Sequence, residues 1–129
     1  MKILLVEDDT ELSLAMSMRL KSYGHQAIPA QDAISAIAMA VKHKPDLAIV
    51  DINLPCGDGF TVLERLNASS ECASIPSILM TASKKDGLKH KAIQHGASGF
   101  LEKPFNSTLL IDAIQSAYDG DSSGNVYHL

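Results

Sequence analysis

The sequence alternates five times between a short apolar run and a segment with helically spaced apolar residues. Continuous apolar runs occupy residues 3–6, 47–50 and 78–80, and weaker runs occupy 27–28 and 99–101. Unbroken runs of this length are typical of strands buried on both faces. Because a helical segment follows each run, the chain is predicted to form a parallel α/β sheet with right-handed crossovers and helices on both faces.

The helical segments share apolar residues that recur three or four positions apart, as in an amphipathic helix whose apolar stripe faces the core. They are marked by Leu12, Met16 and Leu20; by Ile34, Ile37, Ala38 and Val41; by Val62, Leu63 and Leu66; by Leu88 and Ala92; and by Leu110, Ala113, Ile114 and Ala117. Asp9 or Thr10 is placed to cap the first helix, and Pro45 ends the second.

Composition limits the classes of protein to which the chain can belong. With 11 Lys+Arg and 15 Asp+Glu the net charge is −4, and only 5% of residues are aromatic. This balance argues against a general nucleic-acid binder, a base-stacking platform or a polybasic membrane adaptor. Two cysteines and scattered histidines predict neither a disulfide framework nor a zinc site.

Length and local composition indicate one domain. A chain of 129 residues has the size of a single domain. We expect this domain to span residues 1–119, and residues 120–129, rich in Ser, Gly, Asp and Asn, to be a tail or the start of a linker. The apolar run at 3–6 is too short for a membrane span or a signal peptide, so a cytoplasmic location is expected.

Polar side chains follow four of the predicted strands. Glu7 and Asp8 follow the first strand, Asp51 the third, Thr81 the fourth and Lys103 the fifth. Taken singly, each is typical of a helix cap, a turn or a solvated surface. Parallel sheets of this kind bind ligands at the carboxyl ends of their strands, so these side chains are predicted to meet in one pocket.

Such a pocket has the chemistry of phosphoryl transfer. Clustered carboxylates repel one another unless a cation lies between them, and oxygen ligands with open positions suit Mg²⁺. Lys103 and the Thr81 hydroxyl are suited to hold phosphoryl oxygens. Asp51 is the candidate nucleophile, because carboxylates form aspartyl phosphates.

The resemblance to a known family depends on a longer set of motifs. They are the pair Glu7-Asp8, Asp51-x-x-x-Pro55-x-x-Asp58-Gly59, Thr81-Ala82, and Gly96-Ala97-x-x-Phe100-Leu101-x-Lys103-Pro104-Phe105. Over residues 1–119 the chain resembles the receiver domains of bacterial two-component response regulators. The resemblance implies a single-domain, flavodoxin-like (βα)5 fold, doubly wound, with strand order 2-1-3-4-5.

The resemblance also implies a role for each motif residue. Asp51 is expected to accept a phosphoryl group from a sensor histidine kinase or a phosphotransfer protein. Asp8 and Asp51 are expected to ligate Mg²⁺, Glu7 to act through a water molecule, and the backbone carbonyl of Asn53 to complete the metal site. The domain is then a signalling phosphoacceptor rather than an enzyme, catalysing only its own phosphorylation and dephosphorylation.

A switch is implied at the same edge of the sheet. By resemblance, Thr81 and Phe100 form the switch pair, Thr81 and Lys103 bind the phosphate, and the Lys103–Pro104 bond is expected to be cis. Because Phe100 has no hydroxyl group, the switch is expected to operate through packing.

The expected partners follow from the same resemblance. A downstream effector or output domain is expected, without direct binding to nucleic acid or membrane, and a phosphorylation-dependent homodimer is a further candidate. The fourth and fifth helices are the family's usual output face, which four lysines make locally basic: Lys84, Lys85, Lys89 and Lys91. No Arg follows Arg65, so the charged dimer lattice of the winged-helix branch is expected to be absent.

Three other functions compete with this hypothesis. A haloacid-dehalogenase-type phosphatase needs a general acid two residues after its nucleophile, where this chain has Asn53. A flavodoxin needs hydroxyls and amides where Glu7 and Asp8 would repel the cofactor phosphate. A receiver-like interaction module that is never phosphorylated is the third alternative.

Two residues near the predicted pocket have other interpretations. Asp9 is interpreted as a helix cap, with contact to the metal's waters as the alternative. Cys56 is interpreted as a free structural thiol, because no basic neighbour in the sequence lowers its pKa.

Overall fold

The computed structural model describes residues 1–55 and 57–120, which form five strands alternating with five helices. The strands are β1 (Lys2–Val6), β2 (Gln26–Ala30), β3 (Leu47–Asp51), β4 (Ser77–Thr81) and β5 (Gly99–Glu102). The helices are α1 (Thr10–Ser22), α2 (Ala33–His43), α3 (Gly59–Ala68), α4 (Leu88–Gln94) and α5 (Ser107–Tyr118). All neighbouring strands pair in parallel, in the order β2-β1-β3-β4-β5. The predicted alternation and strand order are confirmed.

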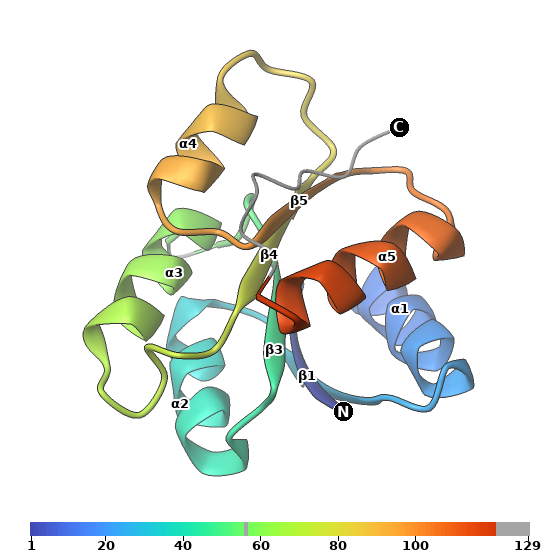
Figure 1. Ribbon diagram of the computed structural model, residues 1–129, viewed down its shortest axis with the longest axis horizontal. Helices are drawn as coiled ribbons and strands as arrows, with labels where there is room; N and C mark the ends of the chain where they lie inside the picture. The colour runs from blue at the N-terminus through green and yellow to red at the C-terminus, as the bar shows by residue number, and fades with distance from the viewer. Residues whose placement is uncertain (56, 121–129) are drawn as a thin grey trace.

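The helices cover both faces of the sheet (Figure 1). Helices α1 and α5 pack on one face, over a core that includes Ile3, Leu5 and Ile49. Helices α2, α3 and α4 pack on the other face, over a core that includes Leu4 and Val50. Successive residues of β1 and β3 therefore enter opposite cores, which explains why these strands are apolar without alternation.

Strand β2 is longer than the strand predicted from the sequence. Only residues 27–28 were expected, whereas the strand spans Gln26–Ala30 and includes Pro29. Proline cannot donate a hydrogen bond to a second neighbouring strand and is tolerated at a sheet edge. β2 lies at the edge and pairs only with β1 among the described strands. The edge position of β2 therefore permits Pro29, a residue that makes the strand harder to predict from the sequence.

Helix α2 faces the sheet with a different stripe from the one the sequence indicated. Its buried residues are Ala33, Ala36 and Ala40. Three residues of the predicted stripe are turned to solvent: Ile34 with 68% of its surface exposed, Val41 with 39%, and Ala38. The expectation that this stripe faces the core is wrong for these three residues, whereas its fourth member, Ile37, is half-buried and packs against the core. Small alanine side chains let the helix backbone lie close to the sheet, and residues on the opposite side of the helix are left outside.

Helix α1 begins at the cap that the sequence indicated. The Asp9 side chain accepts hydrogen bonds from the backbone N–H groups of Glu11 and Leu12, at 3.0 and 3.1 Å. Its interpretation as a helix cap is confirmed.

Two expectations fall on residues that the structure does not describe. Cys56 lies outside the described residues, and so does the predicted tail beyond Gly120. The domain boundary at residue 119 therefore stays a prediction. Within residues 1–55 and 57–120, no helix is long and apolar enough to cross a membrane.

Candidate functional site

Four polar side chains meet at the carboxyl edge of the sheet. Asp51 and Thr81 are the last residues of β3 and β4, Glu7 directly follows β1, and Lys103 directly follows β5. Glu7, Asp51 and Thr81 are buried, whereas the side chain of Lys103 keeps 18% of its surface exposed. The parallel sheet thus brings residues from positions 7 to 103 to one edge, as predicted.

The ammonium group of Lys103 links the two buried carboxylates. Its Nζ donates hydrogen bonds to Glu7 Oε1 at 2.8 Å and to Asp51 Oδ2 at 2.5 Å. The other oxygen of each carboxylate accepts a backbone N–H, from Asp9 to Glu7 Oε2 and from Asn53 to Asp51 Oδ1. The site therefore holds two carboxylates against one cation, with backbone groups fixing both.

Burial and mutual repulsion make the Glu7 carboxyl weakly acidic. Burial raises the pKa of Glu7 from 4.5 to about 7, opposed by the hydrogen bond from Lys103 and reinforced by the neighbouring Asp51. Burial also lowers the pKa of the Lys103 ammonium, but the hydrogen bonds to Asp51 and Glu7 outweigh this effect and the pKa is raised overall. The carboxylate pair thus favours a cation between its members.

A pH dependence of stability follows from the raised pKa of Glu7. In the folded domain Glu7 binds a proton up to about pH 7, whereas in the unfolded chain it does so only up to about pH 4.5. Its contribution to stability is therefore fully present below pH 4.5 and is lost as pH rises through 7. We expect the free energy of unfolding, measured by urea titration without divalent ions, to decline by about 2–3 kcal/mol over this range.

The matched variant for this prediction is Glu7→Gln. Its side chain has nearly the same volume and does not titrate, so its stability should vary less between pH 4.5 and 7 than that of the unsubstituted domain. Equal pH profiles for the two proteins would contradict the assignment of the effect to Glu7.

The predicted switch residues are buried beside this group. Thr81 is fully buried, and its Oγ1 accepts the backbone N–H of Ser83 at 3.0 Å. Its backbone carbonyl accepts the N–H of Lys103 at 2.8 Å, and the Lys103–Pro104 peptide bond is cis, as expected. Phe100 is 2% exposed, so its ring lies inside the domain. A change at Thr81 therefore reaches the backbone that carries Lys103.

The structure brings together two of the three carboxylates expected to bind a metal ion. Asp8 is exposed, in contrast to Glu7 and Asp51. No group of three or more His, Cys, Asp or Glu side chains lies close enough to hold a metal ion, within the part of the chain that the structure describes. The sequence did not predict the ion pair between Lys103 and Glu7. The carboxylates that follow the strands nevertheless favour a nearby positive charge, which Lys103 supplies.

Gly59 is a further residue that the site requires. An added Cβ at this position would lie 2.5 Å from the backbone oxygen of Asp51 and 2.9 Å from Cα of Ile52. The Gly59 N–H also donates to the Ile52 carbonyl at 2.8 Å. The start of α3 thus lies directly against the backbone of Asp51, a closeness that the Asp58-Gly59 motif alone did not reveal.

The lysines expected to make the α4 region basic have different surroundings. Lys84 forms an ion pair with Glu102 at 2.9 Å. The Nζ of Lys91 lies 4.3 Å from the centre of the Phe60 ring, in a cation–π contact between α4 and α3. Two of the four lysines therefore have partners within the domain, which reduces the charge they offer to another protein.

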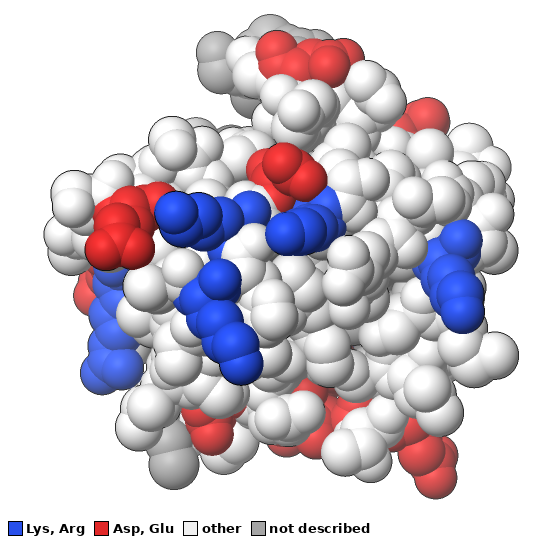
Figure 2. All heavy atoms as spheres, turned by 90° about the horizontal axis from the view of Figure 1, so that it is seen from below, with Lys and Arg blue, Asp and Glu red and all other residues white. Residues whose placement is uncertain are grey.

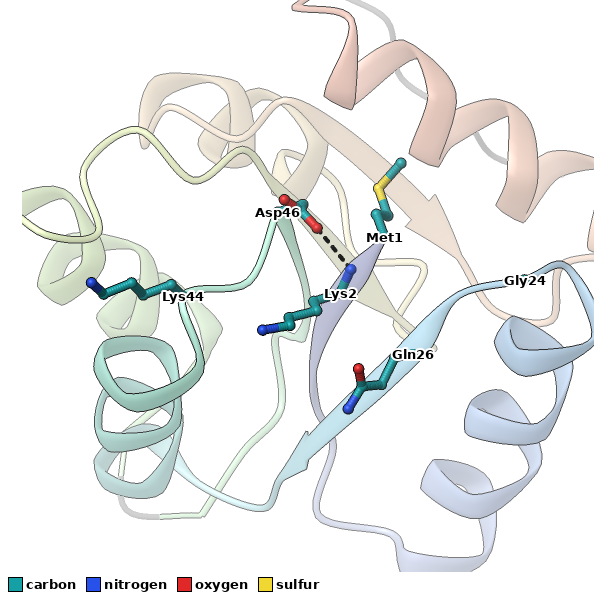
Figure 3. Close-up of a pocket in the computed structure, with 6 residues that line it drawn as sticks. All are labelled: Met1, Lys2, Gly24, Gln26, Lys44 and Asp46. Carbon is teal, nitrogen blue, oxygen red and sulfur yellow. Dashed lines mark hydrogen bonds between the residues drawn. The ribbon is translucent and has the colours of Figure 1, made fainter.

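A cavity at the opposite edge of the sheet is distinct from this site. It has a volume of about 400 Å³ and is lined by residues that include Lys2, Gln26, Lys44 and Asp46 (Figure 3). This edge is the lower side of Figure 1, and seen from below it shows several Lys and Arg side chains across its middle (Figure 2). The cavity lies at the amino ends of β1 and β2, whereas the carboxylates and Lys103 lie at the carboxyl ends.

Comparison with known proteins decides the family. The family model for the response regulator receiver domain matches residues 3–115. The chain belongs to the response regulator receiver family. A receiver domain is a signalling phosphoacceptor of two-component systems rather than a true enzyme, and such a system implies a histidine kinase partner. The phosphatase and flavodoxin alternatives are thereby excluded.

Individual relatives agree with this result. The receiver domain is 37% identical over 115 residues to the "DNA-binding dual master transcriptional regulator RpaA" of Synechocystis sp., covering 89% of this chain and 48% of that protein. It is similar to the chemotaxis protein CheY4 of Vibrio cholerae, with a TM-score of 0.84, 29% identity, and coverage of 90% and 97% of the two chains.

A third relative was solved with a metal ion. The receiver domain of the sensor histidine kinase PA1611 from Pseudomonas aeruginosa, described with a magnesium ion in its active site cleft, has a TM-score of 0.83 and 28% identity. The comparison covers 92% of this chain and 97% of that one. The chain spans about half the length of several curated relatives that it matches.

Proposed function

We propose that Asp51 is the phosphoacceptor of this receiver domain. The observation that carries the proposal is the position of Lys103, whose ammonium lies within hydrogen-bonding distance of both Asp51 and Glu7. A buried carboxylate next to a fixed cation can react with a phosphoryl group, because the cation balances negative charge that would otherwise oppose the approach.

The reaction is an in-line transfer to a carboxylate. An oxygen of Asp51 forms a bond to phosphorus while the bond to the donor breaks, and the donor's imidazole or carboxylate keeps the electron pair. Lys103 pairs with the phosphoryl oxygens, and the Thr81 hydroxyl, whose oxygen accepts the backbone N–H of Ser83, donates its own proton to them. Thr81 and Phe100 form the switch, and because Phe100 is already buried, the response is a change in packing.

The donor set fits Mg²⁺. Glu7 and Asp51 supply buried carboxylate oxygens that face a cation, and hard oxygen ligands are those that Mg²⁺ prefers. Asp8 and the backbone carbonyl of Asn53 follow these residues closely in sequence and complete the proposed ligand set, with Glu7 acting through a water molecule. When bound, the ion supplies positive charge to the attacking carboxylate and the incoming phosphate.

We propose one partner that acts before the phosphorylation of Asp51 and another that acts after it. A histidine kinase or a phosphotransfer protein supplies the phosphoryl group, and a downstream effector or output domain reads the changed surface near α4, β5 and α5. A phosphorylation-dependent homodimer through this surface stays a prediction.

Labelling with a small acyl phosphate tests the proposal. With Mg²⁺ present, intact-protein mass spectrometry should show the addition of one phosphoryl group. The label should be absent in Asp51→Asn and greatly reduced when EDTA removes the metal. The control Asp112→Asn changes an exposed carboxylate of α5 and should label normally. Undiminished labelling of Asp51→Asn would show that another residue accepts the phosphoryl group.

A domain that is never phosphorylated is distinguished by the same experiment. It would show no label in any variant, and calorimetric titration would show no Mg²⁺ binding at millimolar concentrations. Either finding would favour the interaction-module alternative.

A further inference from the structure

The outward face of α2 is apolar from Ile34 to Val41. No charged residue occurs from Ala33 to Val41. The buried side of the helix consists of alanines, and the outward side carries Ile34, Ala38 and Val41, all exposed. We call these three residues the α2 stripe. Between Ala33 and Val41 the half-buried Ser35 is the only polar side chain of the helix. A helix with so few polar residues is typically buried on more than one side, so the exposed α2 stripe is a candidate contact surface.

The charges of α2 lie at its two ends and have opposite signs. Asp32 caps the amino end, where its side chain accepts the N–H of Ser35. Lys42 and Lys44 stand at the carboxyl end, and both are exposed. On the adjoining strand β2, the residues that face α2 include Ile28 and Ala30, which are buried and uncharged. The surface is therefore an apolar stripe with an acidic end and a basic end.

Such a surface is complementary to itself. Two copies related by a two-fold axis present the same patch to each other, with the helices antiparallel. The acidic end of each α2 then meets the basic end of the other, and the opposed helix dipoles attract as well. A different partner would need its own matching arrangement of charge, whereas a second copy has it already.

We infer that a second copy of this chain covers the α2 stripe, with the two-fold axis close to Ala38. Ile34 and Val41 lie four and three residues from Ala38, so each Ile34 packs near Val41 of the second copy. The small side chain of Ala38 allows the two backbones to approach closely at the axis. Asp32 caps the amino end of the helix, and exposed Lys42 lies at the carboxyl end on the same side as Ala38, four residues further along. In the antiparallel pair the basic end of each copy therefore lies beside the acidic end of the other.

This contact does not depend on phosphorylation, because the α2 stripe is exposed in the structure as it stands. One helix face buries less surface than the roughly 1,200–2,000 Å² of a stable interface. The dimer should therefore be weak and should appear only at high protein concentration. It should also weaken with added salt, since exposed charges contribute to it.

Sedimentation of the full chain tests the proposal, from about 10 μM to about 1 mM, which spans weak dissociation constants. We expect reversible dimers, and Ile34→Glu should weaken association at least about tenfold by placing two carboxylates in the apolar contact. The matched control is Leu14→Glu on α1, because Leu14 is 63% exposed and Ile34 is 68% exposed. A monomer throughout this range, or equal effects of the two substitutions, would overturn the proposal.

The position of the axis has its own test. In a Cys56→Ser background, Ala38→Cys should give a disulfide-linked dimer under copper-phenanthroline oxidation, because the two thiols meet at the axis. Ala15→Cys, exposed on α1, should not. Circular dichroism confirms that each variant is folded. Cross-linking of Ala15→Cys that equals or exceeds that of Ala38→Cys would overturn the two-fold arrangement on α2.

Discussion

Gly59→Ala is expected to destabilise the domain by about 2–4 kcal/mol, a large effect for one added methyl group. The new Cβ would lie 2.5 Å from the backbone oxygen of Asp51, well inside contact distance. Neither the Cβ nor the Asp51 oxygen can move without its backbone, since Asp51 ends a central strand and Gly59 begins α3. The overlap can be relieved only if the start of α3 moves away from β3, which also breaks the hydrogen bond from Gly59 to Ile52.

The free energy of unfolding from urea titration measures this effect, and Gly99→Ala is its control. A Cβ at Gly99 would meet the Ile78 side chain at 3.3 Å, and a side chain can adjust where a backbone carbonyl cannot. Gly99→Ala should therefore cost clearly less than Gly59→Ala. We also expect slower labelling of Asp51 in Gly59→Ala, because the displaced backbone carries the reacting carboxylate. Equal losses of stability in the two variants would contradict this explanation.

The sequence predicts the sheet well because its signals are local and repeated. Unbroken apolar runs mark β1, β3 and β4, each buried from both sides, and the helical segment after each run requires a parallel crossover. β2 is the exception, because an edge position tolerates Pro29 and the exposed polar Gln26, which make the strand hard to recognise in the sequence.

The orientation of a helix is harder to predict when its faces are alike. In α2 both the alanine stripe and the larger aliphatic stripe have helical spacing, and hydrophobicity alone favours the larger residues. The distance between helix and sheet decides instead: the fully buried positions hold side chains as small as that of Ala36, and the larger Ile37 is only half-buried. This choice depends on tertiary packing, which no local pattern contains.

In the candidate site, too, some features could be predicted from the sequence and others depend on tertiary structure. The strand order, once inferred, places Glu7, Asp51, Thr81 and Lys103 at one edge, and the structure has them there. The exposure of Asp8 depends on the direction of one side chain after β1, and the ion pair of Lys103 depends on the local balance of charge. Neither follows from the position of a residue in a motif.

Lys103→Met tests how strongly that balance of charge holds the site together. Methionine keeps the length and most of the apolar contact of the side chain but leaves the carboxylates of Glu7 and Asp51 buried without their cation. Removing one partner of a buried ion pair costs about 3–5 kcal/mol, and the partial exposure of Lys103 lowers the expected loss to about 2–4 kcal/mol near pH 7.5 without divalent ions. The exposed Lys85 supplies the control Lys85→Met, for which we expect little change.

The pH profile of Lys103→Met separates lost charge from lost packing. The hydrogen bond from Lys103 lowers the pKa of Glu7, so its removal raises that pKa further above the unfolded value. Stability of the variant should then be regained as pH falls towards 4.5, where Glu7 is protonated. The double variant Glu7→Gln/Lys103→Met removes one of the two facing charges and should be more stable than Lys103→Met alone at pH 7.5. A loss of stability that is the same at every pH would instead assign the effect to packing.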